Sequence, residues 1–205
     1  ANWRGEFRKA IPLCLRAQET AVQFHDGLQE LYALAFRCLC HVSLGEYAEA
    51  LAVINEGLTK ARERDNGFIL GRLTNTLGWL HEELGDFARA LEYDRESIDI
   101  ARRIKNPNVE ISAAINLGFD HLNLGEPKRS LSLLEETLVR VEKFAFGAHR
   151  WRWAIHLHAH LAEALIEAGE PERALVQLEQ GLAQALATRS MKYVARCHAL
   201  RGEIA

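Results

Sequence analysis

The sequence predicts an all-α fold in which about ten helices form antiparallel hairpins that stack into an α-α superhelix. The main observation is a motif of a glycine followed by an acidic residue, which recurs along the 205-residue chain. A constant period of this length is typical of repeat arrays, whose units bury their apolar faces against one another. Between the motifs, apolar residues recur at helical spacing, and no segment is a candidate strand. The motif glycines, 40, 40, 40 and 44 residues apart, are Gly5, Gly45, Gly85, Gly125 and Gly169.

Glycine and proline cluster at these junctions, so each stretch between them is expected to be helical. The junction glycine adopts the left-handed conformation that ends a helix, and the acidic residue after it favours the start of the next one. Pro127 and Pro171 follow in a first turn, where a missing N–H costs nothing. The expected helices, in order, are residues 7–23, 28–44, 47–63, 68–84, 87–103, 109–124, 127–144, 149–168, 171–187 and 192–203.

Small residues recur at fixed distances from the junction glycines, which predicts close contact between helix axes. A large side chain at Gly78 or Ala90 is expected to overpack this contact at a cost of roughly 1–3 kcal/mol. The small residues five positions after each glycine are Ala10, Ala50, Ala90, Ser130 and Ala174.

Composition argues against several classes of partner. The net charge is −3, with 25 basic and 28 acidic residues interspersed, so no basic field is expected to attract nucleic acid. No apolar run reaches the roughly 18–20 residues of a membrane span, and the sequence does not start with a signal peptide. The cysteines lack paired metal-ligand spacing. We therefore expect a cytoplasmic protein without cofactor or metal, with reduced thiols at Cys14, Cys38, Cys40 and Cys197.

The two central repeats resemble the tetratricopeptide repeat signature. The matching residues are Asn75-Thr76-Leu77-Gly78 with Leu84-Gly85-Asp86-Phe87, and Asn116-Leu117-Gly118 with Leu124-Gly125. The resemblance covers essentially the whole chain, but the period is 40 rather than the usual 34 residues. This longer period is similar to kinesin-light-chain-like and bacterial regulatory variants. Residues 101–107 and 149–153 are also similar to helical arrays of large bacterial signalling proteins.

Residues 1–205 are expected to form a single repeat domain. In the repeat register, Ala1 falls between two helices of a hairpin and Ala205 falls inside a first helix. The chain is therefore expected to be a fragment of a larger protein. Because the helix that starts near Phe7 lacks its partner, we also expect self-association through exposed ends of the array.

The resemblance implies that the first helix of each hairpin lines a concave groove that binds a peptide or partner segment. Aromatic side chains supply desolvated area, carboxamides bond a peptide backbone, and Arg72 could pair with a ligand carboxylate. The alternative is that the aromatic residues fill the core and the amides bond neighbouring helices. The candidate binding residues are Tyr32, Phe36, Leu39, Arg72, Asn75, Trp79, Asn116, Phe119, His156 and His160.

One histidine cluster has metal-like spacing. His156 and His160 can share a helix face, and Glu163 could add a third ligand, whereas His158 points away. Packing of these histidines against neighbours is the favoured interpretation. No residue set has the arrangement of a catalytic site. The sequence thus predicts a non-enzymatic protein-interaction module in a signalling or regulatory protein, with a structural or oligomerising spacer as the alternative and a metal-binding protein third.

Overall fold

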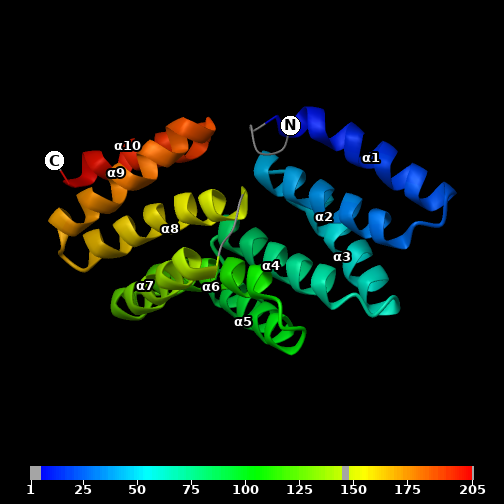
Figure 1. The fold of residues 1–205 in the computed structure, drawn as a ribbon, viewed down its shortest axis with the longest axis horizontal. Coiled ribbons are helices and arrows are strands. Elements are labelled where there is room, and N and C mark those ends of the chain that lie inside the picture. The colour runs from blue at the N-terminus through cyan, green and yellow to red at the C-terminus, as the bar shows by residue number, and fades with distance from the viewer. Residues whose placement is uncertain (1–5, 145–147, 205) are drawn as a thin grey trace. The chain divides into compact units, whose positions relative to one another are not determined.

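The computed structural model describes residues 6–144 and 148–204, and these ranges contain helices and no strand (Figure 1). Each helix lies within two residues of its expected bounds. The helices are α1 (Phe7–Gln23), α2 (Gly27–Leu44), α3 (Tyr47–Glu63), α4 (Gly67–Glu83), α5 (Phe87–Arg103), α6 (Pro107–Asn123), α7 (Pro127–Phe144), α8 (Ala148–Glu167), α9 (Pro171–Thr188) and α10 (Met191–Ile204).

The predicted glycine ends are confirmed at four junctions, whereas Gly5 lies outside the described residues. These glycines have φ values of +74 to +78°, which closes the turn between the two helices of a hairpin. They are Gly45, Gly85, Gly125 and Gly169.

At three junctions, the acidic residue after the glycine pairs with a histidine of the preceding helix. The distance from the histidine Nδ1 to the carboxylate oxygen is 2.8 Å for His41 and Glu46 and 2.6 Å for His121 and Glu126. The recurring histidine is therefore more than a packing residue, because it ties the end of one helix to the start of the next.

In the part of the chain that the structure describes, a second kind of turn joins consecutive hairpins, and its left-handed residue is not a glycine. A left-handed residue with φ of 49–56° ends α1, α3, α5 and α9. A short polar side chain then caps the next helix in three of these turns. Asp26 accepts from the Gln29 N–H and Asn66 from the Ile69 N–H, both at 3.0 Å, and Asn106 accepts from the Val109 N–H at 3.2 Å. The left-handed residues are His25, Asp65, Lys105 and Arg189.

The chain divides into two compact units, Ala1–Glu110 and Ile111–Ala205. In the first unit, one apolar core extends from α2 to α4, with Leu34, Ile54 and Leu73 fully buried. In the second, Leu134, Leu157 and Leu161 form the main core. The small residues five positions after each glycine are all buried, as the predicted close approach requires.

Helix contacts in both units follow the order of the chain. From α1 to α5 and from α7 to α10, consecutive helices pack together, and α2 also contacts α4, as α8 contacts α10. First helices of successive hairpins therefore lie side by side within a unit. The fold class is the predicted all-α helical repeat. Among the described residues, no helix combines the length and apolarity needed to cross a membrane.

Candidate binding site

The predicted binding residues lie on first helices, but in both units. Nine are half-buried and His160 is buried. The first unit holds Tyr32, Phe36 and Leu39 on α2, with Arg72, Asn75 and Trp79 on α4. The second unit holds Asn116 and Phe119 on α6, with His156 and His160 on α8.

In the first unit, Arg72 lies between aromatic rings of two helices. The guanidinium carbon is 5.4 Å from the ring centroid of Phe36 on α2 and 5.6 Å from that of Phe68 on α4. The ring of Tyr32 is in turn 6.1 Å from that of Phe68. These distances are typical of cation–π contacts, which hold the cation over the faces of the rings. We call Tyr32, Phe36, Phe68 and Arg72 the aromatic–arginine site.

The charge of Arg72 is poorly compensated within the protein. In residues 6–144 and 148–204, no carboxylate lies within ion-pair distance of its guanidinium. Burial lowers the pKa of Arg72 from its ordinary value, because removal from water disfavours the charged form. Arginine nevertheless stays protonated, so the site carries a half-desolvated positive charge.

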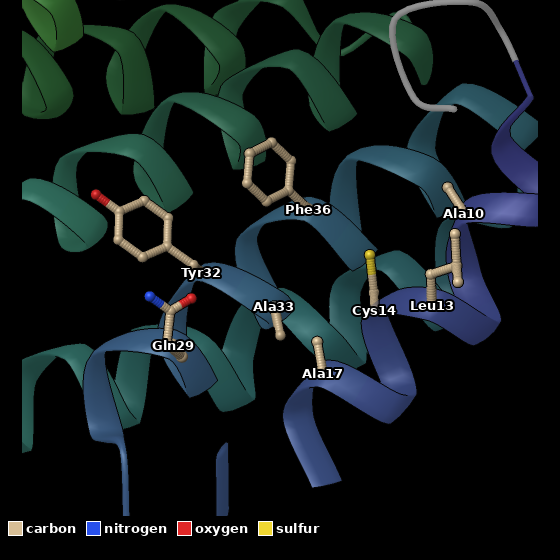
Figure 2. Close-up of a pocket in the computed structure, with 8 residues that line it drawn as sticks. All are labelled: Ala10, Leu13, Cys14, Ala17, Gln29, Tyr32, Ala33 and Phe36. Carbon is tan, nitrogen blue, oxygen red and sulfur yellow. The ribbon is translucent and has the colours of Figure 1, made fainter. Parts of the chain in front are cut away.

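An apolar groove adjoins this site. It lies between α1 and α2, has a volume of about 510 Å³, and shares Tyr32 and Phe36 with the aromatic–arginine site. Figure 2 shows these two rings on α2, with Cys14 on α1. The lining residues are Ala10, Leu13, Cys14, Ala17, Gln29, Tyr32, Ala33 and Phe36, and we call this feature the α1–α2 groove.

Asn75, Trp79 and Leu39 are engaged with the protein itself. The Asn75 amide donates to the carboxylate of Asp94 on α5 at 2.7 Å, and the Trp79 indole N–H donates to Glu83 at 2.9 Å. Trp79 and Leu39 also pack against the core of the first unit. These contacts match the alternative interpretation, in which the amide bonds a neighbouring helix and the aromatic ring covers the core.

The second unit contains a related cluster around Arg196 of α10. Its guanidinium carbon is 5.0 Å from the ring centroid of Phe119, and it forms an ion pair with Glu163 of α8. The ring of His160 lies 4.5 Å from that of Phe119. Burial, followed by the nearby charge of Arg196, lowers the pKa of His160 well below its ordinary value, so His160 is neutral at pH 7.

The histidines of α8 have protein partners. The Tyr193 hydroxyl lies 2.8 Å from Nδ1 of His156, and Nδ1 of His158 lies 2.8 Å from the Gln177 side-chain oxygen. Since Glu163 is paired with Arg196, all three proposed metal ligands contact side chains of α6 or α10. This arrangement supports the packing interpretation of the cluster.

Comparison with known families identifies the repeat. Family models described as tetratricopeptide repeat match residues 31–103 and residues 155–180. These two segments therefore carry tetratricopeptide repeats. The two matches fall in different units, and they include the helices that carry the aromatic–arginine site and His160. No curated protein sequence matches the chain.

Solved structures confirm the tetratricopeptide-like fold at low sequence identity. BtubC (BKLC) from P. vanneervenii is 14% identical with a TM-score of 0.62, and the match covers 97% of this chain and 92% of that one. A Rap protein complexed with competence and sporulation factor is 10% identical with a TM-score of 0.68, covering 99% and 61%. A putative kinesin light chain from P. anserina, with nearly identical TPR-like repeats, is 15% identical with a TM-score of 0.56, covering 91% and 98%.

Sequence reasoning within this repeat family missed Phe68 and the α1–α2 groove. A signal for Phe68 was present, because it lies four residues before Arg72 and so shares its helix face. The α1–α2 groove could not be predicted from the sequence. Most of the residues that line it are small or apolar, and such residues usually pack between helices.

Proposed function

We propose that the chain is a protein-interaction module that binds an acidic peptide segment in its first unit. A carboxylate of the segment would pair with Arg72, and apolar side chains next to it would occupy the α1–α2 groove. The observation that carries this proposal is the half-buried guanidinium of Arg72, stacked on Phe36 and Phe68 without a carboxylate partner among the described residues. The proposal assigns no catalytic step to the chain.

The second unit supports a carboxylate as the ligand group. Arg72 and Arg196 occupy equivalent positions of the repeat, and both lie over phenylalanine rings. At Arg196 the protein supplies a carboxylate of its own, from Glu163. At Arg72, the bound peptide would supply the corresponding carboxylate. A charge-assisted bond to a desolvated arginine is among the stronger polar contacts available to a peptide.

The α1–α2 groove supports a peptide rather than a lone anion. Its lining is mainly apolar, and its open shape admits side chains next to the carboxylate. Tyr32 and Phe36 contribute to both features, so one extended segment could contact both. The Rap protein of similar fold is seen in a complex with competence and sporulation factor, which agrees with a binding role for this architecture.

Peptide arrays test the proposal on many candidate segments at once. Wild-type protein is incubated with an array of random peptides. For every acidic peptide, the array also holds a matched peptide in which Gln replaces Glu and Asn replaces Asp. We expect wild type to prefer acidic members and Arg72→Gln to lose this preference, at a cost of roughly 10-fold or more in affinity. Arg173→Gln is the matched control, because Arg173 is exposed and already paired with Glu135 and Glu170.

An Arg72→Gln protein that keeps the acidic preference would contradict the proposal. The sequence-based expectation of contacts at Trp79 and Asn116 stays a prediction, and the double variant Trp79→Ala with Asn116→Ala tests it on the same array. Loss at Arg72 with retention in the double variant would place the site at Arg72 rather than at Trp79 and Asn116.

Self-association through α1 is the second candidate, and exposed apolar side chains favour it. Phe24 is 72% exposed, Val22 53% and Leu13 50%. Sedimentation velocity over a hundredfold range of protein concentration tests this idea with wild type and Val22→Asp. A monomer at every concentration would rule it out, whereas a dimer that Val22→Asp disrupts would support it.

A further inference from the structure

The α1–α2 groove is the repeat equivalent of a surface that another helix covers. The residues of α1 that line the groove recur 40 positions later on α3, and there all of them are buried. On α1, in contrast, Cys14 is half-buried and Leu13 is 50% exposed (Figure 2). α2 packs against both α3 and α4, so the first helix of the hairpin covers this face of α3. The buried equivalents are Ala50, Val53, Ile54 and Gly57.

Gly57 shows how such a face is covered. A Cβ added at Gly57 would lie 2.6 Å from the Leu73 side chain of α4 and 3.7 Å from the Cβ of Leu34 on α2. Gly57 thus lies between the first helix of its own hairpin and that of the next hairpin, and Gly181 of α9 lies likewise between α8 and α10. At Ala17, the equivalent residue of α1, α2 supplies the helix of the next hairpin, yet Ala17 is exposed. The surface around Ala17 therefore has room for a first helix.

The outer face of α10 lacks the opposite partner. α10 is a first helix in the repeat register, and its outer face is exposed, although the same face of α8 is buried. A Cβ added at Gly202 would meet no described atom within 4 Å. At the equivalent Gly78 and Gly118, it would lie 2.8 and 2.5 Å from side chains of α5 and α7, the second helices of those hairpins. The outer face of α10 consists of Ala195, His198, Ala199 and Gly202, which correspond to Ile155, His158, Ala159 and Ala162 of α8.

We propose that copies of this chain associate head to tail, with α10 of one copy seated in the α1–α2 groove of the next. α10 and α1 of the neighbouring copy would form a hairpin across the interface, as α8 and α9 do within one chain. In the repeat register, Gly202 would lie against Cys14 of the neighbouring copy, just as Gly118 lies against Leu134. Each copy offers one groove and one α10, so the contact can be repeated from copy to copy.

The contact would continue an interface that the protein already builds. α2 occupies the equivalent place on α3 and α4, and α8 occupies it on α9 and α10. Units of a repeat array contact only their neighbours, so each hairpin buries a similar surface against the next. Ala10 and Ala17 on α1, with Ala199 and Gly202 on α10, are small residues that let two helix axes approach closely. The seated helix would also bury the exposed side chain of Leu13.

The head-to-tail contact differs from both functions proposed above. Self-association through Val22 and Phe24 of α1 does not involve α10, whereas this contact requires it. The seated helix would occupy the space assigned to apolar side chains of the peptide, so a peptide and a second copy would compete for the groove. The proposal itself rests on the helix faces and does not require that a peptide binds.

Sedimentation velocity with two blocked variants, in the absence of any peptide, tests the contact. Ala17→Asp places a carboxylate in the groove and leaves α10 intact, whereas Ala199→Asp places one on α10 and leaves the groove intact. We expect the average mass of wild type to rise with protein concentration. Each variant alone should lose about a hundredfold or more in affinity for itself, because the interface would bury an unpaired carboxylate. An equimolar mixture should form a dimer of one molecule of each variant and nothing larger, since one intact groove and one intact α10 remain.

Ala52→Asp is the matched control, because Ala52 is exposed on α3 and lies outside both faces, and it should associate as wild type does. Wild type that stays monomeric at every concentration would overturn the proposal. A mixture of folded variants that stays monomeric, or Ala199→Asp protein that associates as wild type does, would overturn it as well.

Hydrogen exchange of wild type at high and low protein concentration gives a test that needs no variant. Protection of backbone amides should increase with concentration in α1, α2 and α10, because these helices form the contact. An increase that leaves out α10 would overturn the proposal even if the variants fail to fold.

Discussion

Asp94 shows how tightly single residues determine the contact between two helices. This carboxylate is fully buried on α5 and accepts from the Asn75 amide on α4. It also lies against Gly78, where an added Cβ would be 2.8–2.9 Å from the carboxylate atoms. The sequence identified Gly78 as a site of close approach but not its polar neighbour. A recurring small residue indicates that two helices lie close together, and only the structure identifies the side chain that it contacts.

Gly78→Ala is expected to destabilise the protein by about 1–3 kcal/mol, because the methyl group must displace a carboxylate that Asn75 holds. Urea unfolding, monitored by circular dichroism, measures the difference in unfolding free energy between the variant and wild type. Gly202→Ala is the control, since its Cβ would meet no atom within 4 Å and the helix of α10 should gain up to about 1 kcal/mol. Equal effects of the two substitutions would contradict the close contact at Gly78.

Asp120 is expected to make stability fall with rising pH. Burial raises the pKa of this carboxyl to about 8, and neither oxygen has a hydrogen-bond partner in the described part of the chain. Because the folded pKa exceeds the unfolded one, the contribution is complete below about pH 4 and is lost as the pH rises to 8. The unfolding free energy should decrease by up to about 1.4 kcal/mol per pH unit in this interval.

Asp120→Asn should remove this dependence and be more stable than wild type at pH 8. Urea unfolding at several pH values between 5 and 8 measures the difference between variant and wild type. Asp99→Asn, which makes the same charge change at an exposed position, should keep the wild-type profile. An Asp120→Asn profile parallel to that of wild type would exclude the assigned pKa.

At the scale of the helix, the two kinds of turn explain which turns could be located from the sequence. Turns within hairpins contain glycine, so a simple pattern located them to within two residues. The described turns between hairpins have the left-handed conformation at a residue other than glycine, as at Asp65 and Lys105. The positions of these turns could be predicted only from where the helical pattern of apolar residues ends.

The sequence did not predict the pairs of His41 with Glu46 and of His121 with Glu126. Residues five apart across a helix end follow no standard spacing rule.

Opposite substitutions in the two turns should have opposite effects. Gly85→Ala is expected to cost about 1 kcal/mol or more, because Gly85 has φ of +75° and no neighbour that a Cβ would meet. Lys105→Gly, at φ of +52°, should be stabilising by up to about 1 kcal/mol, reduced by the greater freedom of glycine in the unfolded chain. Chemical denaturation measures both, and changes of the same sign would argue against left-handed geometry at one of them.

At the scale of the whole molecule, the periodic pattern predicted the helical repeat and the burial of its small residues. It placed the predicted binding residues on first helices, yet it could not identify which of their side chains bond or pack against other parts of the protein. Arg72 and Arg196 illustrate this limit, because they occupy equivalent repeat positions, but Arg196 pairs with a carboxylate from another helix and Arg72 does not. Such a difference depends on contacts between segments far apart in sequence.

Each unit has its own core, so damage to one core should remain local. Leu34→Ala in the first unit is expected to cost about 2–5 kcal/mol and to speed amide exchange mainly in α2, α3 and α4. Leu157→Ala should act mainly on α7 and α8. Hydrogen exchange with mass spectrometry compares the two patterns. Uniform loss of protection over the whole chain in either variant would mean that the array unfolds as one cooperative block.

The order of helix contacts has a consequence for how the protein is made. Since the helices of each unit pack against their nearest or next-nearest neighbours along the chain, the mean sequence separation of contacts is small. Chains of this kind fold fast, because little loop entropy is lost before contacts form. Each hairpin is therefore expected to complete its contacts in that direction soon after the first helix of the next hairpin leaves the ribosome, without requiring a segment much farther along the chain.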